Sequence, residues 1–403
     1  MNYCQARMQT RKALIVGGGI AGPVAALALR RAGIDSVVHE AYPDSIDDAG
    51  AMLAIAPNGL AALRVLGAEG VLQRLGQPIR SMVIADGRGR KLGEFPGLAG
   101  LPPSWAVSRS EFARALRSLA TAEGVRFEYG KRFVGADETS AGITAHFADG
   151  SAASGDVLIG ADGIHSVVRT LIDPRAPAPE RVPLLNFGAV ADVAVDARPD
   201  VMYFVFGDKG FFGYWLQLDG RTAWFSNLPS ATFMTSAQAR AVPVDDWLRR
   251  LRAAYTQDEP ARTLLQHTAA DRLLVLGSME LMPSLPCWHR GRMVLVGDSA
   301  HAPSSSSGQG ASLAIESAVE LARCLRDIPD VSGAFVAYER LRRSRVEQVA
   351  ARAAKTNHSK TLGPVARTLM RLMMPIATKT FMNPERTLGT EQRYRIDWSA
   401  VVA

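Results

Sequence analysis

Three separated stretches of this chain place glycines and an acidic residue directly after an apolar run. In the first stretch, Gly17, Gly19 and Gly22 follow the apolar run 13–16, and Glu40 lies 18 residues after Gly22. Glycines at this spacing let the backbone approach a pyrophosphate, a following helix offers free amides to its charge, and an acid binds ribose hydroxyls. The stretch therefore predicts a dinucleotide site, and Glu40 argues against a 2′-phosphate on that ribose.

The other two stretches lie far away along the chain. Asp162 follows an apolar run at 156–159, and Asp298 follows another at 293–296. A glycine-rich turn at 307–310 then leads into a helical pattern, so that backbone amides at a helix start would face a ligand. A dinucleotide site alone does not distinguish NAD from FAD. Together the three stretches indicate the separated pieces of one FAD site.

The elements that must position these residues begin as a doubly wound α/β fold. Residues 13–16 and 36–39 are predicted strands on either side of a predicted helix at 22–32, which makes one βαβ unit. Helical spacing returns at 58–75 and at 110–122, with Ser108 or Ser110 as the N-cap of the latter. Residues 124–159 alternate like antiparallel strands, and 334–354 predicts a long arginine-rich helix.

Residues 183–283 differ in character, because aromatic side chains recur there in short alternating runs. This pattern predicts a mostly antiparallel β-sheet inserted into the nucleotide domain, as a platform for a substrate. Successive residues of a strand face opposite sides, so only about half of these aromatics can line a pocket. We predict that Phe204, Trp215 and Phe225, together with Met52, contact the substrate.

Composition bounds the remaining possibilities. The chain has 403 residues, enough for about two domains, and a formal charge of +7 that is scattered except for a cluster at 340–345. Nucleic-acid binding would need a basic patch interleaved with aromatic residues, and the basic region of this sequence has none. Cys4, Cys287 and Cys324 lack the spacing of a disulfide framework or a metal site, which favours a reducing, cytoplasmic compartment.

Two segments resemble membrane or targeting signals. The uncharged run 13–29 follows two basic residues, but its glycines and proline are better explained by a strand, a turn and a helix than by a signal peptide. The Met- and Leu-rich segment 366–381 is interrupted by Pro375, which favours packing against the nucleotide domain over a membrane contact. We therefore expect no stable membrane insertion.

The three motifs, in this order, make the chain resemble the class A flavoprotein monooxygenases, the family of para-hydroxybenzoate hydroxylase, salicylate hydroxylase and the tetracycline-inactivating hydroxylases. The resemblance covers about residues 11–345. It implies a Rossmann-like FAD-binding domain at 11–180, which includes some substrate-side strands, and again at 286–335. The inserted β-sheet substrate domain would occupy 181–285, and a C-terminal helical segment 336–403.

The resemblance also implies a role for each motif residue. The ADP half of FAD would contact Gly17, Gly19, Ala21, Gly22 and Glu40. Arg109 matches the family arginine near the pyrophosphate and adenine, Asp162 would support the pyrophosphate and transient nicotinamide binding, and Asp298 would bind the ribityl chain. The flavin pyrimidine edge would face the amides of the turn and helix start, which include Gly308, Gly310, Ala311 and Ser312. Ser305 stands where the family usually has proline, so the surroundings of the ring are not settled by the resemblance.

The implied activity is NADPH- or NADH-dependent insertion of one atom of O2 into a small aromatic or polyketide-like substrate, through a flavin C4a-hydroperoxide. The cofactor carries that chemistry, so no catalytic side chain is assigned. His301 is interpreted as structural, and so is the pairing of His165 with Asp162, since Asp162 already has a role beside the cofactor. A flavin-dependent dehydrogenase or reductase acting on an apolar substrate remains the alternative. A flavin-dependent halogenase is disfavoured because 224–229 does not match WxWxIP.

Overall fold

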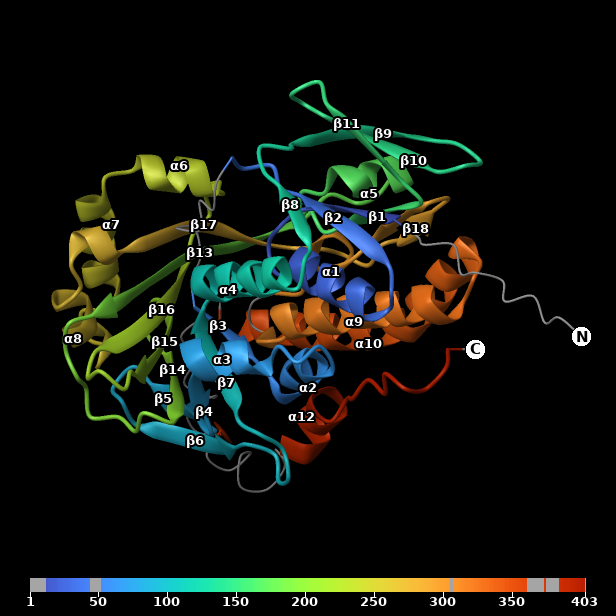
Figure 1. Ribbon diagram of the computed structural model, residues 1–403. Helices are drawn as coiled ribbons and strands as arrows, with labels where there is room; N and C mark the ends of the chain where they lie inside the picture. The colour runs from blue at the N-terminus through green and yellow to red at the C-terminus, as the bar shows by residue number, and fades with distance from the viewer. Residues whose placement is uncertain (1–11, 44–51, 305–306, 361–372, 375–383, 403) are drawn as a thin grey trace, which may run out of the picture.

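The computed structural model describes residues 12–43, 52–304, 307–360, 373–374 and 384–402 (Figure 1). A six-stranded sheet with the order β18-β19-β12-β1-β2-β8 brings the three motifs together, because each follows one of its strands. The strands are β1 (Lys12–Val16), β2 (Asp35–His39), β8 (Arg126–Glu128), β12 (Val157–Gly160), β18 (His289–Arg290) and β19 (Met293–Leu295). All pair in parallel except β18 with β19. Parallel strands end at one edge of a sheet, so segments that are distant in sequence meet there.

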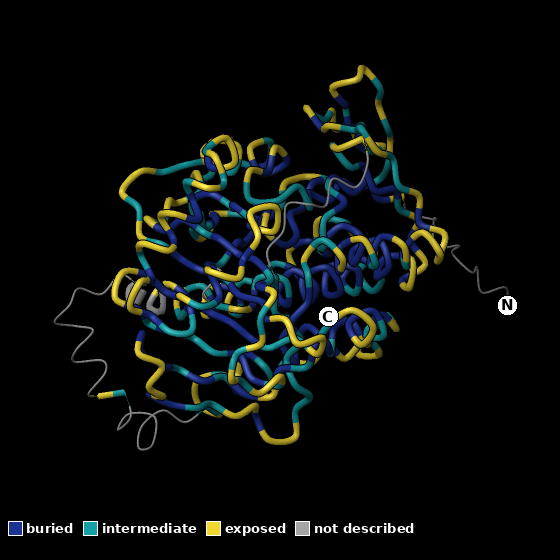
Figure 2. The backbone as a smooth tube through the Cα atoms, turned by 90° about the vertical axis from the view of Figure 1, so that its left-hand side faces the viewer, coloured by how far each residue is buried: buried dark blue, intermediate teal, exposed yellow. Residues whose placement is uncertain are grey.

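Helices cover this sheet and provide the core of the nucleotide domain. α1 (Ala21–Arg31) packs against α9 (Gly310–Asp327), and α9 packs in turn against α10 (Val331–Lys360). α1 and α9 are mostly buried, and Figure 2 shows the buried backbone in dark blue at the centre of the molecule with exposed segments around it. α4 (Arg109–Ala122) packs against α1, and α5 (Val167–Ile172) packs against β19. The predicted cap of α4 is confirmed, since the Ser108 side chain accepts a hydrogen bond from the Glu111 amide.

A seven-stranded sheet with the order β17-β13-β16-β15-β14-β5-β6 forms the predicted platform. Its strands are β5 (Ser81–Asp86), β6 (Lys91–Pro96), β13 (Glu180–Ala191), β14 (Val201–Phe206), β15 (Phe211–Leu216), β16 (Thr222–Pro229) and β17 (Leu274–Leu281). Only β5 and β14 pair in parallel. In Figure 1, α6 (Ser236–Ala241), α7 (Val244–Ala254) and α8 (Ala261–Gln266) lie on its outer side. The expected α/β fold with a mostly antiparallel second sheet is thus confirmed.

The region predicted to be uniformly antiparallel divides between two sheets. β9 (Phe133–Glu138), β10 (Ile143–Phe147) and β11 (Ala152–Gly155) form a separate antiparallel sheet. The strands on either side of them, β8 and β12, instead join the parallel sheet, where β12 is fully buried between β1 and β19 and β8 pairs with β2 at the edge. The domain limits given above remain predictions, although β5 and β6 do add strands from the first part to the second sheet.

The helical run predicted at 58–75 is two helices, α2 (Pro57–Val65) and α3 (Glu69–Leu75). Gly67 separates them with a φ of +66°, a conformation that a helix cannot contain. A third small sheet, β3 (Met52–Ile55), β7 (Ser104–Ser108) and β4 (Gln77–Ile79), lies between α9 and the seven-stranded sheet. Near the C-terminus is α12 (Pro384–Gln392), whereas most of the segment 366–381 lies outside the described residues.

Candidate functional site

The three glycines of the first motif have three different surroundings. Gly17 has a φ of +106°, and a Cβ built there would lie 2.4 Å from the carbonyl oxygen of Ala161. A Cβ at Gly22 would lie 2.0 Å from the Gly17 oxygen, whereas one at Gly19 would meet no atom within 4 Å. Gly17 therefore allows the turn, Gly22 allows close packing of α1, and Gly19 leaves open the space that a pyrophosphate would need.

Glu40 lies against the same turn, where its carboxylate accepts hydrogen bonds from the amides of Gly18, at 2.6 Å, and Tyr42, at 3.0 Å. The Gly18 carbonyl accepts a bond of 3.0 Å from the Arg117 guanidinium, which is only 7% exposed. Sequence reasoning missed Arg117. Its spacing from Ala113 and Ala120, both on the buried face of α4, is the signal that could have identified it.

Asp162 shapes the turn after β12. One carboxylate oxygen accepts hydrogen bonds from the amides of Val167, at 2.8 Å, and Val168, at 3.2 Å, which caps α5. The other oxygen is buried and has no hydrogen-bond partner in the described part of the chain. Burial raises the pKa of Asp162, although several hydrogen bonds oppose the shift. Asp162 thus holds the loop between β12 and α5 through one oxygen, while its other oxygen is buried without a hydrogen-bond partner among the described residues.

The second and third motifs are joined by two side chains that sequence reasoning assigned no role. Arg169 donates to the carbonyls of Ser299, at 3.1 Å, and Ile164, at 2.6 Å. The Ser299 hydroxyl donates to the Gly160 carbonyl at 2.5 Å. His165, by contrast, pairs with Glu280 of β17 at 3.1 Å. These contacts agree with the interpretation of His165 and Asp162 as structural rather than as a dyad.

Asp298 and Arg109 interact across the ends of β19 and α4. The Asp298 side chain is accessible, yet protein surrounds it closely enough that desolvation raises the pKa of its carboxyl group, with the charge of Arg109 opposing that rise. An accessible but enclosed side chain lines a concave surface. Gly297 beside it has a φ of +68°, and a Cβ there would lie 2.9 Å from the Cβ of Ala21. Ala21 therefore lies where the first and third motifs meet.

The start of α9 presents main chain rather than side chains. A Cβ built at Gly308 or Gly310 would meet no atom within 4 Å. Leu313 donates the first intrahelical hydrogen bond, to the Gln309 carbonyl at 2.8 Å, so the amides of 310–312 precede the helical ladder and can serve an anion. Ser312 is fully buried, and its hydroxyl accepts a bond of 3.1 Å from the Ala56 amide, so the Ser312 side chain is not available to a ligand.

His301 is fully enclosed beneath this turn, where its Nε2 contacts the Ser317 hydroxyl at 3.0 Å. Burial is the largest cause that lowers the pKa of His301, to about 3, with a further contribution from Arg342. An imidazole that is neutral and buried at working pH supports packing, as predicted. Ser305, the departure from the family pattern, lies outside the described residues.

Three of the residues predicted to contact substrate lie on one face of the seven-stranded sheet, and Met52 of β3 packs against that face. Met52, Phe204 and Phe225 are partly exposed and pack on a cluster that contains Trp215. Trp215 is itself only 1% exposed, so it supports the face from below and offers almost no surface to a ligand. The intervening aromatics Phe212, Tyr214 and Trp224 pack on the opposite face, toward the outer helices. Alternate aromatic residues of these strands thus lie on opposite faces of the sheet, as predicted.

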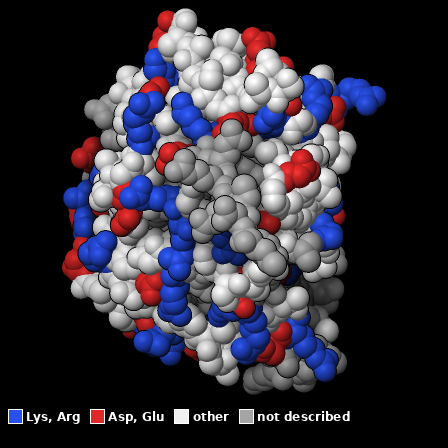
Figure 3. Space-filling model, turned by 45° about the vertical axis from the view of Figure 1, so that its right-hand side comes forward, with Lys and Arg blue, Asp and Glu red and all other residues white. Residues whose placement is uncertain are grey.

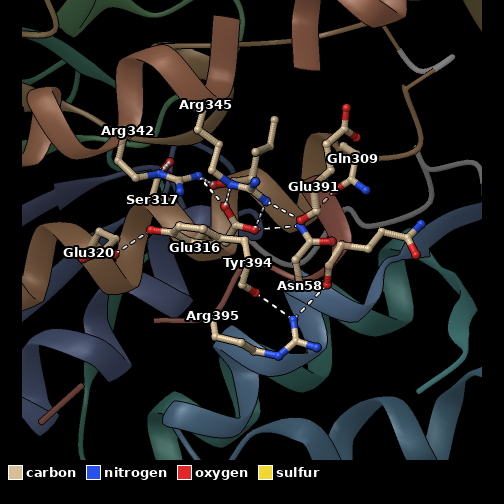
Figure 4. A network of polar contacts seen from close by, with 12 residues as sticks. Asn58, Gln309, Glu316, Ser317, Glu320, Arg342, Arg345, Glu391, Tyr394 and Arg395 are labelled. Atoms are coloured by element: carbon tan, nitrogen blue, oxygen red, sulfur yellow. Dashed lines mark hydrogen bonds and ion pairs between the residues drawn. The ribbon is translucent and has the colours of Figure 1, made fainter. Parts of the chain in front are cut away.

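The basic cluster at 340–345 is mostly directed inward. Arg342 and Glu316 are both 0% exposed and form an ion pair of 2.6 Å, and Arg345 adds a second of 2.8 Å to the same carboxylate (Figure 4). Arg343 pairs with Glu339 and Glu347. On the face shown in Figure 3, acidic side chains also lie among the basic ones. These arginines therefore stabilise the helix layer.

Comparison with known proteins agrees with this geometry. Residues 10–353 match the family described as "FAD binding domain" (FAD_binding_3). The FAD-dependent urate hydroxylase of Klebsiella pneumoniae is 30% identical over 351 residues, which is 85% of this chain and 89% of that protein. The aurachin C monooxygenase/isomerase of Stigmatella aurantiaca is 28% identical, over 84% of this chain and 86% of its own. Klebsiella pneumoniae HpxO complexed with FAD and uric acid superposes with a TM-score of 0.82 and 25% identity, covering 95% of this chain and 96% of that one.

These relatives favour oxygen insertion over the alternative of a flavin-dependent dehydrogenase or reductase. They are named as monooxygenases and hydroxylases, and the match covers most of the length of each.

Across the described ranges, no helix is long and apolar enough to cross a membrane. The open space that a Cβ would meet at Gly19, Gly308 and Gly310 leaves room for a ligand at both the first motif and the start of α9. The chain belongs to the FAD binding domain family and is a class A FAD-dependent monooxygenase.

Proposed function

We propose that this monooxygenase hydroxylates a flat, uncharged aromatic compound that binds between the flavin and the Phe204–Phe225 face of the seven-stranded sheet. FAD would lie with its ADP half at Gly17–Gly22 and Glu40 and its ribityl chain at Asp298. Its pyrimidine edge would then face the amides of 310–312. When bound, FAD supplies the redox and oxygen chemistry, with NADPH or NADH as the electron donor typical of the family.

The observation that carries the substrate assignment is the composition of two neighbouring rows across the sheet. The strand register aligns Val190, Ala223, Trp215, Met202 and Met82 in one row, and Gly188, Phe225, Gly213, Phe204 and Ile84 in the next. Every residue of these rows is apolar or glycine. A carboxylate buried against such a face would have no compensating partner there, and that is costly.

The shape of the second row suits a flat ring. The Phe225 ring lies over Gly213, where a Cβ would meet the ring at 2.2 Å, and it is directed toward Phe204, with 6.2 Å between the ring centroids. On the other side, a Cβ at Gly188 would meet only the Trp224 carbonyl oxygen, at 3.4 Å. The next row of the same face contains Asn186 and Asn227, and the Asn227 amide donates to the Asn186 side-chain oxygen at 2.6 Å.

The test compares 2-naphthol with 6-hydroxy-2-naphthoate, which adds a carboxylate to the same ring system. Stopped-flow absorbance would follow flavin reduction by NADH or NADPH, and mass spectrometry would follow incorporation of isotopically labelled O2. We expect the neutral compound to accelerate flavin reduction and to gain one labelled oxygen atom, and the anion to do neither. Equal turnover of the carboxylate or of urate would refute the uncharged substrate. NAD(P)H consumption without labelled product from any compound of a wider aromatic panel would refute the hydroxylation.

A further inference from the structure

We propose that Asn58 is a positioning residue for the flavin. It would hold the first turn of α9 against a buried ion cluster and thereby set how strongly the amides of 310–312 bind the cofactor. The inference rests on the proposed placement of the flavin at the start of α9. It concerns a side chain of α2 that does not belong to any of the three nucleotide motifs.

The ion cluster is centred on Glu316, two helical turns after Gln309. Its carboxylate is fully buried and is balanced by Arg342 and Arg345 of α10, as Figure 4 shows. Arg345 also donates to the carbonyl of Glu391 at 2.7 Å, which connects the cluster to α12 near the C-terminus. Three helices thus fix the position of the Glu316 carboxylate.

Asn58 connects that fixed point to the turn that would face the flavin. Its amide nitrogen donates to the Glu316 carboxylate at 2.7 Å and to the Gln309 side-chain oxygen at 2.9 Å, and the residue is only 1% exposed. Gln309 is the N-cap residue of α9. Because Asn58 holds the Gln309 side chain in the interior, the open side of the turn carries main-chain groups and the two glycines.

Two further contacts join the same corner of the chain to the first turn of α9. The Ala56 amide donates to the Ser312 hydroxyl, and a Cβ at Gly59 would lie 2.6 Å from that hydroxyl oxygen. The start of α2 therefore lies directly on α9, with no room for a larger residue. A change at Asn58 would therefore act on the first turn of α9 through Gln309, the residue directly before the amides in question.

The residue type itself points to a positioning role. Both hydrogen atoms of the Asn58 amide are used, yet its oxygen is buried without a hydrogen-bond partner in the described ranges. An unpaired buried acceptor costs stability, so optimal stability alone does not explain an asparagine at this position. Aspartate would offer no donor and would add a like charge beside Glu316.

The experiment measures FAD binding to Asn58→Ala protein, by removing the flavin and titrating FAD back with fluorescence detection. We expect Kd to rise by about fivefold to a hundredfold, the range for a buried group that loses its hydrogen-bond partner. The midpoint potential should become more negative, because amides at a helix start favour the anionic reduced flavin. The shift is about 30 mV for each tenfold difference between the affinities of oxidised and reduced FAD.

The matched control is Thr268→Val, which removes a buried side-chain hydrogen bond of 3.0 Å to Trp224 on the outer face of the second sheet. It should lower Tm comparably while Kd and potential stay at their wild-type values. If Asn58→Ala changes only Tm, as this control does, the inference is wrong.

A double-mutant cycle with Gln309→Ala tests the connection between the two side chains. If Asn58 acts through Gln309, the double variant should bind FAD no more weakly than the weaker single variant, whereas additive losses would refute the connection. Should Asn58→Ala fail to fold, Gln309→Ala alone must raise Kd, and an unchanged Kd would overturn the inference. Asp298→Ala separates the two proposals. If it leaves FAD affinity intact, the flavin placement is wrong, and if it weakens binding while Asn58→Ala does not, only the role of Asn58 is wrong.

Discussion

Replacing Glu316 by Gln tests the energetic role of the buried ion cluster. The substitution keeps the shape of the side chain but removes the charge that Arg342 pairs with at 2.6 Å, in a position where neither side chain is exposed. Burial opposes ionisation, yet Arg342 and Arg345 lower the pKa of Glu316, so the carboxylate is charged in the folded protein at neutral pH. A neutral amide at this position would leave a buried guanidinium without its counter-charge.

Breaking a buried ion pair by removing one partner costs about 3–5 kcal/mol. An unfolding entropy of about 2.1 cal/mol/K per residue, taken over the 403 residues, gives about 0.85 kcal/mol/K, so Tm should fall by about 4–6 °C. The assay is thermal unfolding of the FAD-loaded protein, followed by calorimetry or circular dichroism. Adding Arg342→Met should recover part of the loss, because the unpaired charge is then also removed.

The control is Asp246→Asn, which breaks an ion pair of 2.6 Å with Arg249 on the surface of α7, where the arginine is 75% exposed. Such exposed pairs contribute little, so Tm should change by about 1 °C or less. A Glu316→Gln protein that unfolds within about 1 °C of this control would refute the reasoning, since the buried pair would then be no stronger than a solvated one.

Three further predictions concern the nucleotide turn, the substrate face and pH. Gly22→Ala should abolish FAD retention, because its Cβ would lie 2.0 Å from the Gly17 oxygen; equilibrium dialysis with FAD measures this, and normal retention would contradict the role of Gly22. Gly188→Val should raise KM for the aromatic substrate while FAD affinity stays unchanged, as steady-state kinetics and FAD titration would show; an unchanged KM would place the substrate elsewhere. His301→Gln should reduce the loss of stability in acid. Burial lowers the pKa of His301 to about 3, so its stabilising contribution is full above the unfolded pKa of about 6.5 and is lost as pH falls toward 3, by about 1.4 kcal/mol per pH unit. Tm measured from pH 7.5 to pH 5 checks this, and equal slopes for both proteins would count against it.

Local patterns carried most of the fold prediction, because strands, turns and helix starts depend on neighbouring residues. The first βαβ unit and the cap at Ser108 follow from periodicity and from residues with special backbone properties. The same approach went wrong at 58–75, where the apolar spacing continues across Gly67 although the chain turns there. It also placed 124–159 in one antiparallel arrangement, since strand pairing depends on partners that the segment itself does not contain.

The aromatic strands show how far alternation alone can go. It separated Phe204 and Phe225 from Phe212 and Trp224, which do lie on opposite faces. It did not separate Phe225 from Trp215, because both lie on the same face and only the packing of Met202 and Ala223 around Trp215 decides which is accessible. Exposure within a face is set by side chains from other strands.

By itself, the sequence indicated an α/β flavoprotein, through its motifs and the family that they resemble. It also predicted a nucleotide site divided among three segments, because glycine spacing and strand-ending acids are local requirements of nucleotide binding. Only the tertiary structure decided what holds the site in place. The side chains that do so bond to partners far away in the sequence. Asn58 bonds to Gln309, 251 residues away, and Arg117 bonds to Gly18, 99 residues away. Arg169 bonds to Ser299 at a separation of 130 residues, and Glu316 to Arg345 at a separation of 29. Such partners meet only when sheets and helices pack, because a buried polar group must find its hydrogen bonds wherever the fold brings a donor or acceptor within reach.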